Sequence, residues 1–194
     1  MTSFIEKNVP LRIFGYLRIK HGYRAHYNIL IPAFLTGVFF VGVISVADEL
    51  PSVGDKGLLG DFSQLLAILS PFYLAALAAV STFGGKVNID NPIDMANPPE
   101  ITHFVKGRWE TPKVLTTRQF LSLLFGYCAA VSILLFLVTV LSEKANAINV
   151  VATWSPGFFL NYGISLSFLF VFFHMITASF LGIYYLSDKI HRDF

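Results

Sequence analysis

The chain of 194 residues carries too few charges and too many apolar side chains for a water-soluble domain. Hydrophobic residues make up 55% of it, charged residues only 13%, and 20 residues are Phe. Its one cysteine, Cys128, excludes a disulfide framework and a cysteine-based metal site. The net charge of +2 excludes little as a total, so the placement of the charges along the chain carries the argument.

Four long stretches contain no Asp, Glu, Lys or Arg. They cover residues 25–47, 62–85, 119–142 and 145–187. Each is long enough to cross a hydrocarbon core of about 30 Å, which needs roughly 20 helical residues. The sequence therefore predicts an all-α fold, a polytopic four-helix transmembrane bundle within residues 27–186. The predicted spans are about 27–46, 62–84, 117–141 and 158–186.

The first 26 residues form a basic segment with five cations and a single acid, Glu6. Within it, Leu11, Phe14 and Leu17 recur at helical spacing among the basic residues. This pattern predicts an N-terminal amphipathic helix that lies at the membrane interface and meets anionic lipid with its basic side chains. A basic leader that is simply solvated is the alternative.

The Lys and Arg residues are divided unequally among the loops. Twelve of the 14 lie in residues 1–26, in the long connection 84–117 with its first following residues, and in the tail 187–194. The connections near residues 47–61 and 145–156 are poor in them. Because cytoplasmic loops carry the excess of Lys and Arg, we expect both termini and the 84–117 loop on the cytoplasmic side.

Small residues in spans two and four predict close helix contacts between copies of the chain. Alanines follow Ser70-Pro71 in span two, and Gly163 and Ser167 lie in the outer half of span four. In lipid, small residues let helix backbones approach closely, so we expect span two to be central in the bundle. The sequence predicts a homo-oligomer with contacts at Ala75, Ala79, Gly163 and Ser167.

Two polar residues within span four, Asn161 and His174, stand out from their apolar surroundings. Polar groups at this depth are costly and usually face the bundle interior or a water-filled path. A neutral, hydrogen-bonded packing histidine and a pore-lining or pH-sensing one are both compatible with the position of His174.

The 84–117 loop offers a weak signal for chemistry. Asp90 and Asp94 stand four apart, and with His103 they could meet a divalent cation or a lipid headgroup. Acids among turn residues are more often solvated charges or helix caps. Because no phosphate cradle or nucleophile motif accompanies them, we expect no enzymatic activity and no cofactor.

Basic residues flank the membrane on the expected cytoplasmic side and form a predicted collar for a partner or for lipid. Their charge, next to an interface Trp, is compatible with anionic headgroups, an acidic protein partner or nucleic acid, although we expect no direct nucleic-acid binding. A topology signal alone is the simpler interpretation. The collar comprises Arg18, Lys20, Arg24, Lys106, Arg108, Trp109 and Lys113.

Thr116 and Gln119 match a capping box, which predicts that the third span begins near Thr117. Four spans in under 200 residues, a basic start at residues 11–24 and a Pro-rich loop leading into Thr116-Thr117-Arg118-Gln119-Phe120-Leu121 together resemble the KwaA family, the membrane subunits of bacterial Kiwa antiphage defence systems. The resemblance carries no functional residue over, because it rests on architecture.

The resemblance implies a homo-oligomer, a tetramer, in the bacterial inner membrane. Such a protein senses phage attack at the envelope and works with a DNA-binding cytoplasmic partner. The first hypothesis is therefore a non-enzymatic membrane sensor or scaffold that recruits a cytoplasmic protein. An oligomeric pore with a lumen of Ser, Thr, Asn161 and His174 is the second. A small membrane enzyme that acts on lipid headgroups is the third.

Overall fold

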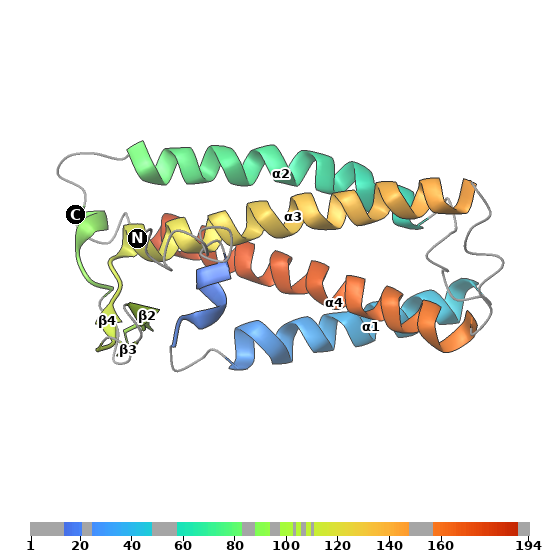
Figure 1. Ribbon diagram of the computed structural model, residues 1–194, viewed down its shortest axis with the longest axis horizontal. Helices are drawn as coiled ribbons and strands as arrows, with labels where there is room; N and C mark the ends of the chain where they lie inside the picture. Colours follow the sequence, from blue (N-terminus) through green and yellow to red (C-terminus); the bar gives the residue numbers. More distant parts are fainter. Residues whose placement is uncertain are drawn as a thin grey trace.

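The computed structural model describes most of the chain and consists mainly of four long helices (Figure 1). The helices are α1 (Ile31–Ala47), α2 (Leu58–Thr82), α3 (Thr117–Ala147) and α4 (Gly157–Tyr184). A π-helical turn, His26–Leu30, precedes α1, and a second one, Tyr185–Lys189, follows α4. The described residues are 14–20, 25–47, 58–82, 88–93, 98–102, 104–105, 108–109, 111–147 and 157–189.

All four helices are long and apolar enough to cross a membrane. The apolar windows are His26–Val43, Phe62–Thr82, Thr117–Ser142 and Gly163–Ser187. Many large apolar side chains on them point outward, among them Phe34, Ile68 and Phe180, each about 70% exposed. Such surfaces are suited to lipid and not to water. The four predicted spans are confirmed as helices of this kind.

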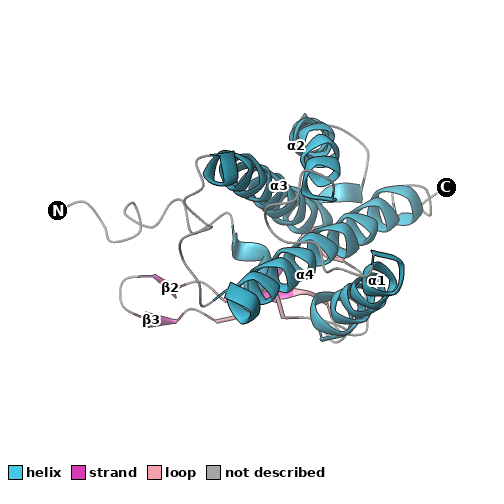
Figure 2. Ribbon diagram, turned by 90° about the vertical axis from the view of Figure 1, so that its right-hand side faces the viewer, coloured by secondary structure: helices cyan, strands magenta, loops and turns pink. Residues whose placement is uncertain are grey.

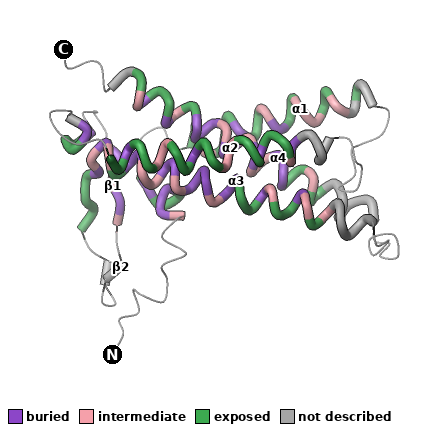
Figure 3. The backbone as a smooth tube through the Cα atoms, turned by 90° about the horizontal axis from the view of Figure 1, so that it is seen from above, coloured by how far each residue is buried: buried purple, intermediate pink, exposed green. Residues whose placement is uncertain are grey.

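The helices lie side by side in the order α2, α3, α4, α1 (Figures 1 and 2). Half of the apolar windows of α3 and α4 is buried, against 17% for α1 and α2, so α3 and α4 form the central pair. Figure 3 shows the same division, with more buried residues along the described part of α3 than along the largely exposed α2. The expectation that span two is central was wrong.

Helix α2 lies at the edge of the bundle because it packs on its neighbours through only one of its faces. It packs on its neighbours through Leu66, Tyr73 and Val80, which are at most 1% exposed and recur every seven residues. The Tyr73 hydroxyl lies 2.6 Å from the Ser179 hydroxyl of α4, and Ser70 Oγ donates to Ser132 Oγ of α3 at 3.0 Å. Ala75, Ala78 and Ala79 lie on the exposed side of α2, and Ala76 is partly buried against the core. Large side chains and hydrogen bonds, not small residues, hold α2 in place.

At one end of the bundle the chain forms a small folded cap. We use this name for residues 14–20, 88–93, 98–102 and 111–116, at the left of Figure 1. The cap contains the strands β1 (Glu100–Ile101) and β4 (Lys113–Val114), which pair antiparallel. The hairpin strands β2 (Phe104–Val105) and β3 (Arg108–Trp109) also pair antiparallel. The described part of the loop thus contains no long helix, as its prolines predict. Its short strands depart from the expected all-α fold.

The predicted interfacial helix is not confirmed. In its described part, residues 14–18 form a single 3-10 turn, and Tyr16 and Ile19 are only 1% exposed. These two side chains lie three positions apart, and Leu17 between them is 38% exposed. The described segment therefore buries Tyr16 and Ile19 among the helices and leaves Leu17 at the surface. Leu11 lies outside the described residues.

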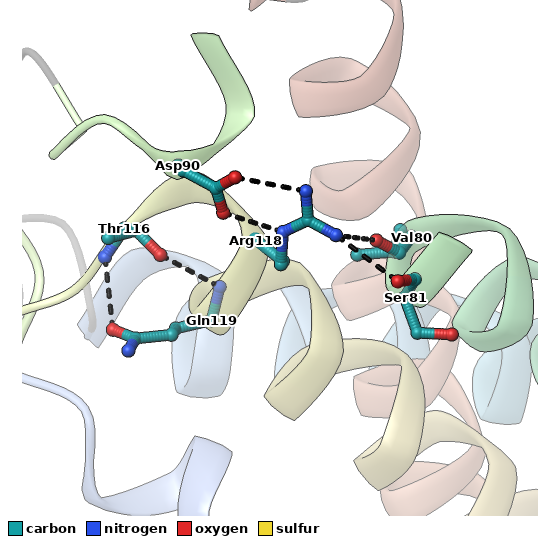
Figure 4. A network of polar contacts seen from close by, with 6 residues as sticks. All are labelled: Val80, Ser81, Asp90, Thr116, Arg118 and Gln119. Carbon is teal, nitrogen blue, oxygen red and sulfur yellow. Dashed lines mark hydrogen bonds and ion pairs between the residues drawn. The ribbon is translucent and has the colours of Figure 1, made fainter. Parts of the chain in front are cut away.

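The start of α3 matches the prediction. The backbone N–H of Gln119 donates to Thr116 Oγ1 at 3.2 Å, and the N–H of Thr116 donates to Gln119 Oε1 at 3.3 Å. This reciprocal pair is a capping box, and it satisfies two backbone donors at the helix start (Figure 4). Helix α3 begins at Thr117, where the sequence placed it.

Candidate functional site

Backbone hydrogen bonds join the four ranges of the chain that make up the cap. Lys20 and Glu100 form an antiparallel bridge, in which the N–H of Lys20 donates to the Glu100 carbonyl at 2.8 Å and the N–H of Glu100 donates to the Lys20 carbonyl at 3.0 Å. On its other side β1 pairs with β4, where Glu100 faces Val114. A second bridge joins Pro92 to Thr116. The basic segment near the N-terminus and the loop are therefore one folded unit.

The cap presents basic side chains to solvent. Arg18, Lys20 and Lys113 are exposed, and two of them belong to the same small sheet. Since successive side chains of a strand point to opposite faces, the register places Lys20 with Glu100 on one face and Lys113 with Ile101 on the other. These three residues of the predicted collar thus lie at one end of the bundle, but not on a single flat surface.

The other collar residues are described only in part. Arg24 and Lys106 lie outside the described residues. Arg108 and Trp109 form β3, which pairs with β2, and their side chains lie outside the described part of the chain.

Arg118 links the cap to the helices through a set of contacts that we call the clasp (Figure 4). Its Nε donates to Asp90 Oδ1 at 2.6 Å and its Nη2 donates to Asp90 Oδ2 at 3.1 Å. Its Nη1 donates to the carbonyl oxygens of Val80 and Ser81 at 3.1 and 3.2 Å. One side chain at the start of α3 therefore holds both the 3-10 turn Asn88–Asp90 and the end of α2.

The contacts of the clasp suit the chemistry of arginine. A planar guanidinium can bind both carboxylate oxygens and still donate elsewhere, and the last carbonyls of a helix carry partial negative charge. Two of the three partner residues belong to the last turn of α2, where carbonyl oxygens lack partners within the helix. The clasp thus neutralises Asp90 and caps α2 at the same time.

From the sequence, Arg118 is one of the basic residues of the inner side and has no predicted partner within the fold. A usable signal was present, because a cation in the first turn of a helix lies next to the positive end of the helix dipole and is unfavourable there. Such a residue needs an acceptor from elsewhere in the fold. Asp90, 28 residues earlier in the chain, supplies it.

Asp90, the first candidate ligand of the possible cation site, is already bound to Arg118 in the clasp. Both carboxylate oxygens of Asp90 bind Arg118, while Asp94 and His103 lie outside the described residues. Within the described ranges, no group of three His, Cys, Asp or Glu residues is placed to hold a metal ion.

His174 lies inside the bundle. It is 5% exposed, and its Nδ1 lies 2.9 Å from the Tyr127 hydroxyl of α3. The Tyr127 and Tyr16 rings pack around it with centroids 5.5 and 6.4 Å from the imidazole. This environment favours the packing interpretation of His174 over a pore-lining one. Asn161 belongs to α4, but its side chain lies outside the described residues.

The small residues predicted to make helix contacts all face outward in the single chain. Ala75, Ala79, Gly163 and Ser167 are exposed. Gly163 and Ser167 border an open apolar groove of about 480 Å³ between α3 and α4, which Leu135, Val138 and Phe168 also line. These faces are therefore available to lipid or to another chain.

Comparisons of the chain with protein-family models, with curated proteins and with solved structures gave no match.

Proposed function

We propose that the protein is a non-enzymatic membrane scaffold, or sensor, that recruits a cytoplasmic protein through its cap. The observation that carries the proposal is the clasp. Arg118 fixes a folded, solvent-exposed and basic cap to helices that are long and apolar enough to cross a membrane. A connection that served only to join two helices would need neither paired strands nor this anchoring.

The sidedness of the cap rests on the distribution of Lys and Arg, which favours the cytoplasm for the end where α2 ends and α3 begins. By its resemblance to Kiwa membrane subunits, we place the chain in the bacterial inner membrane and in antiphage defence. The partner is then a cytoplasmic protein, DNA-binding itself, that approaches with an acidic surface. Anionic lipid headgroups near the membrane plane compete for the same cations.

The two other hypotheses gain less support. A pore lined by hydroxyls and His174 would need these groups to face a lumen, yet Thr177 Oγ1 donates to the Phe173 carbonyl at 2.8 Å and His174 is buried. An enzyme that acts on lipid headgroups through Asp90 would have to release it from Arg118. The scaffold uses the exposed residues and leaves the buried ones in structural roles.

Charge reversal on the cap tests the proposed recruitment. The double substitution Lys20→Glu and Lys113→Glu should lower recovery of a co-expressed product of a neighbouring gene by about tenfold at low salt, because two attractive charges become repulsive. Recovery should be measured by affinity purification from detergent at several salt concentrations. The matched control is Lys56→Glu with Lys144→Glu, the same change at the two cations expected on the other side. Equal recovery of both variants at every salt concentration would reduce the collar to a topology signal.

The proposed assembly into a homo-oligomer, a tetramer by the resemblance, depends on the outward small-residue faces. Ala79→Leu and Gly163→Leu should shift the detergent-solubilised protein towards a single chain, because bulk blocks close approach of a second copy. Neither residue packs inside its own chain, since both are exposed and no atom lies within 4 Å of a Cβ built on Gly163. Light scattering gives the mass, and Val41→Leu on the lipid-facing side of α1 is the control. A mass unaffected by both bulky substitutions would place the contacts elsewhere.

A further inference from the structure

At the cap end of the bundle, residues 14–20 lie against α3, α4 and the turn that precedes α1 (Figure 1). Tyr16 and Ile19 are among the most buried side chains of the described residues, although they belong to a short irregular segment and not to a long helix. We call residues 14–20 the plug. The buried side chains of Tyr16 and Ile19 make the plug part of the core at the cap end.

The plug fits its surroundings closely. The Tyr16 hydroxyl donates to Asn28 Oδ1 at 3.0 Å, and its ring centroid lies 5.2 Å from that of Tyr127. A Cβ added to Gly15 would lie 3.1 Å from Leu123 Cδ2, so even a methyl group would crowd α3. The plug is therefore closely packed in a specific position and is not loosely collapsed on the helices.

The surroundings of the plug are unusually polar for the interior of a membrane bundle. Asn28 faces the plug from the π-helical turn His26–Leu30, and Tyr127 and His174 face it from α3 and α4. Apolar side chains would fill such a space at less cost, since buried polar groups need partners. A π-helical turn in place of regular helix is also rare and occurs frequently at functional sites. These features favour a surface that becomes exposed when the plug leaves its position.

A backbone bridge ties the plug to the loop. Lys20, the last plug residue, exchanges two backbone hydrogen bonds with Glu100 of β1. Strand β1 pairs in turn with β4, and β4 leads through the capping box into α3. A displacement of β1 would therefore act first on Lys20, which follows Tyr16 by four residues.

We propose that residues 14–20 are a releasable plug, that the Lys20–Glu100 bridge is its latch, and that displacement of β1 withdraws the plug to uncover Asn28, Tyr127 and His174. Release converts an event at the cap into a change inside the bundle. The latch and the plug stand on the contacts alone. Only their use in signalling rests on the proposed function, since it needs a partner at the cap.

Proline at position 100 tests the latch. Glu100→Pro removes the N–H that donates to Lys20, and this N–H points away from β4, because Glu100 and Val114 face each other at a non-hydrogen-bonded position. Hydrogen exchange in lipid nanodiscs should then become about tenfold faster in residues 14–20, while residues 117–135 keep their protection. Val114→Pro is the matched control, because the N–H of Val114 points away from β1 and therefore from the latch. It should leave exchange in residues 14–20 unchanged.

Lys20→Pro removes the other hydrogen bond of the bridge from the plug side and should give the same local effect. Unchanged exchange in residues 14–20 of both latch variants would overturn the proposal. Loss of protection in α3 together with the plug would also overturn it, since the bridge would then hold the whole fold. Because exchange is measured without any partner, failure of the latch and failure of recruitment are distinguishable.

Discussion

Replacing Arg118 with alanine is expected to lower the free energy of unfolding by about 2–3 kcal/mol, since it removes hydrogen bonds of a charged donor to one carboxylate and two carbonyl groups. The end of α2 would lose its cap and Asp90 its counter-ion. Titration of the purified protein with denaturing detergent, followed by loss of helical signal, measures the change.

Two further substitutions separate the parts of the clasp. Asp90→Asn should cost only about 0.5–1 kcal/mol, because Asp90 is 68% exposed and an exposed ion pair is screened by water. Arg118→Lys keeps the charge without the planar fork, so its loss should lie between the other two. Equal losses for Asp90→Asn and Arg118→Ala would mean that the carbonyl contacts with α2 contribute nothing.

Replacing Gly182 with alanine is expected to cost about 1–3 kcal/mol through overpacking. A Cβ at this position would lie 2.8 Å from Leu124 Cδ2 and 2.9 Å from Phe125 Cζ. Both neighbours are at most 1% exposed, so they have no free space to move into. Of the two glycines of α4 whose surroundings are described, Gly182 is therefore the one at which α4 packs closely on α3.

Gly163→Ala provides the matched control on the same helix. No atom lies within 4 Å of a Cβ built on Gly163, so alanine there should change the stability of the single chain by less than about 1 kcal/mol. The same detergent titration compares the two variants. A Gly182→Ala variant as stable as Gly163→Ala would contradict the close packing of α3 on α4.

Composition and charge predicted the helices well, because the membrane imposes strong rules. A span must be apolar and long enough, and the absence of charges marks it directly in the sequence. The start of α3 was predictable because the capping box is a local pattern, confined to Thr116 and Gln119.

The partners of individual side chains were not predictable in this way. Lipid and protein core are both apolar, so the pattern in residues 11–19 could not distinguish an interfacial helix from a segment buried among helices. Small residues permit close approach without requiring it, and therefore Ala75 and Ala79 did not make α2 central. The clasp joins residues 28 positions apart, and no local pattern encodes such a pair.

We propose that the cap lies in the cytoplasm at the inner ends of four spans, and reporter fusions give the most direct test of this orientation. Fusions at residue 1, near Met95 and after Phe194 should report the cytoplasm, and fusions near Asp55 and Ala147 should report the outside, as the 12 of 14 Lys and Arg residues on the inner segments predict. An outside signal from the fusion near Met95 would contradict this orientation, because no cytoplasmic protein could then reach the cap.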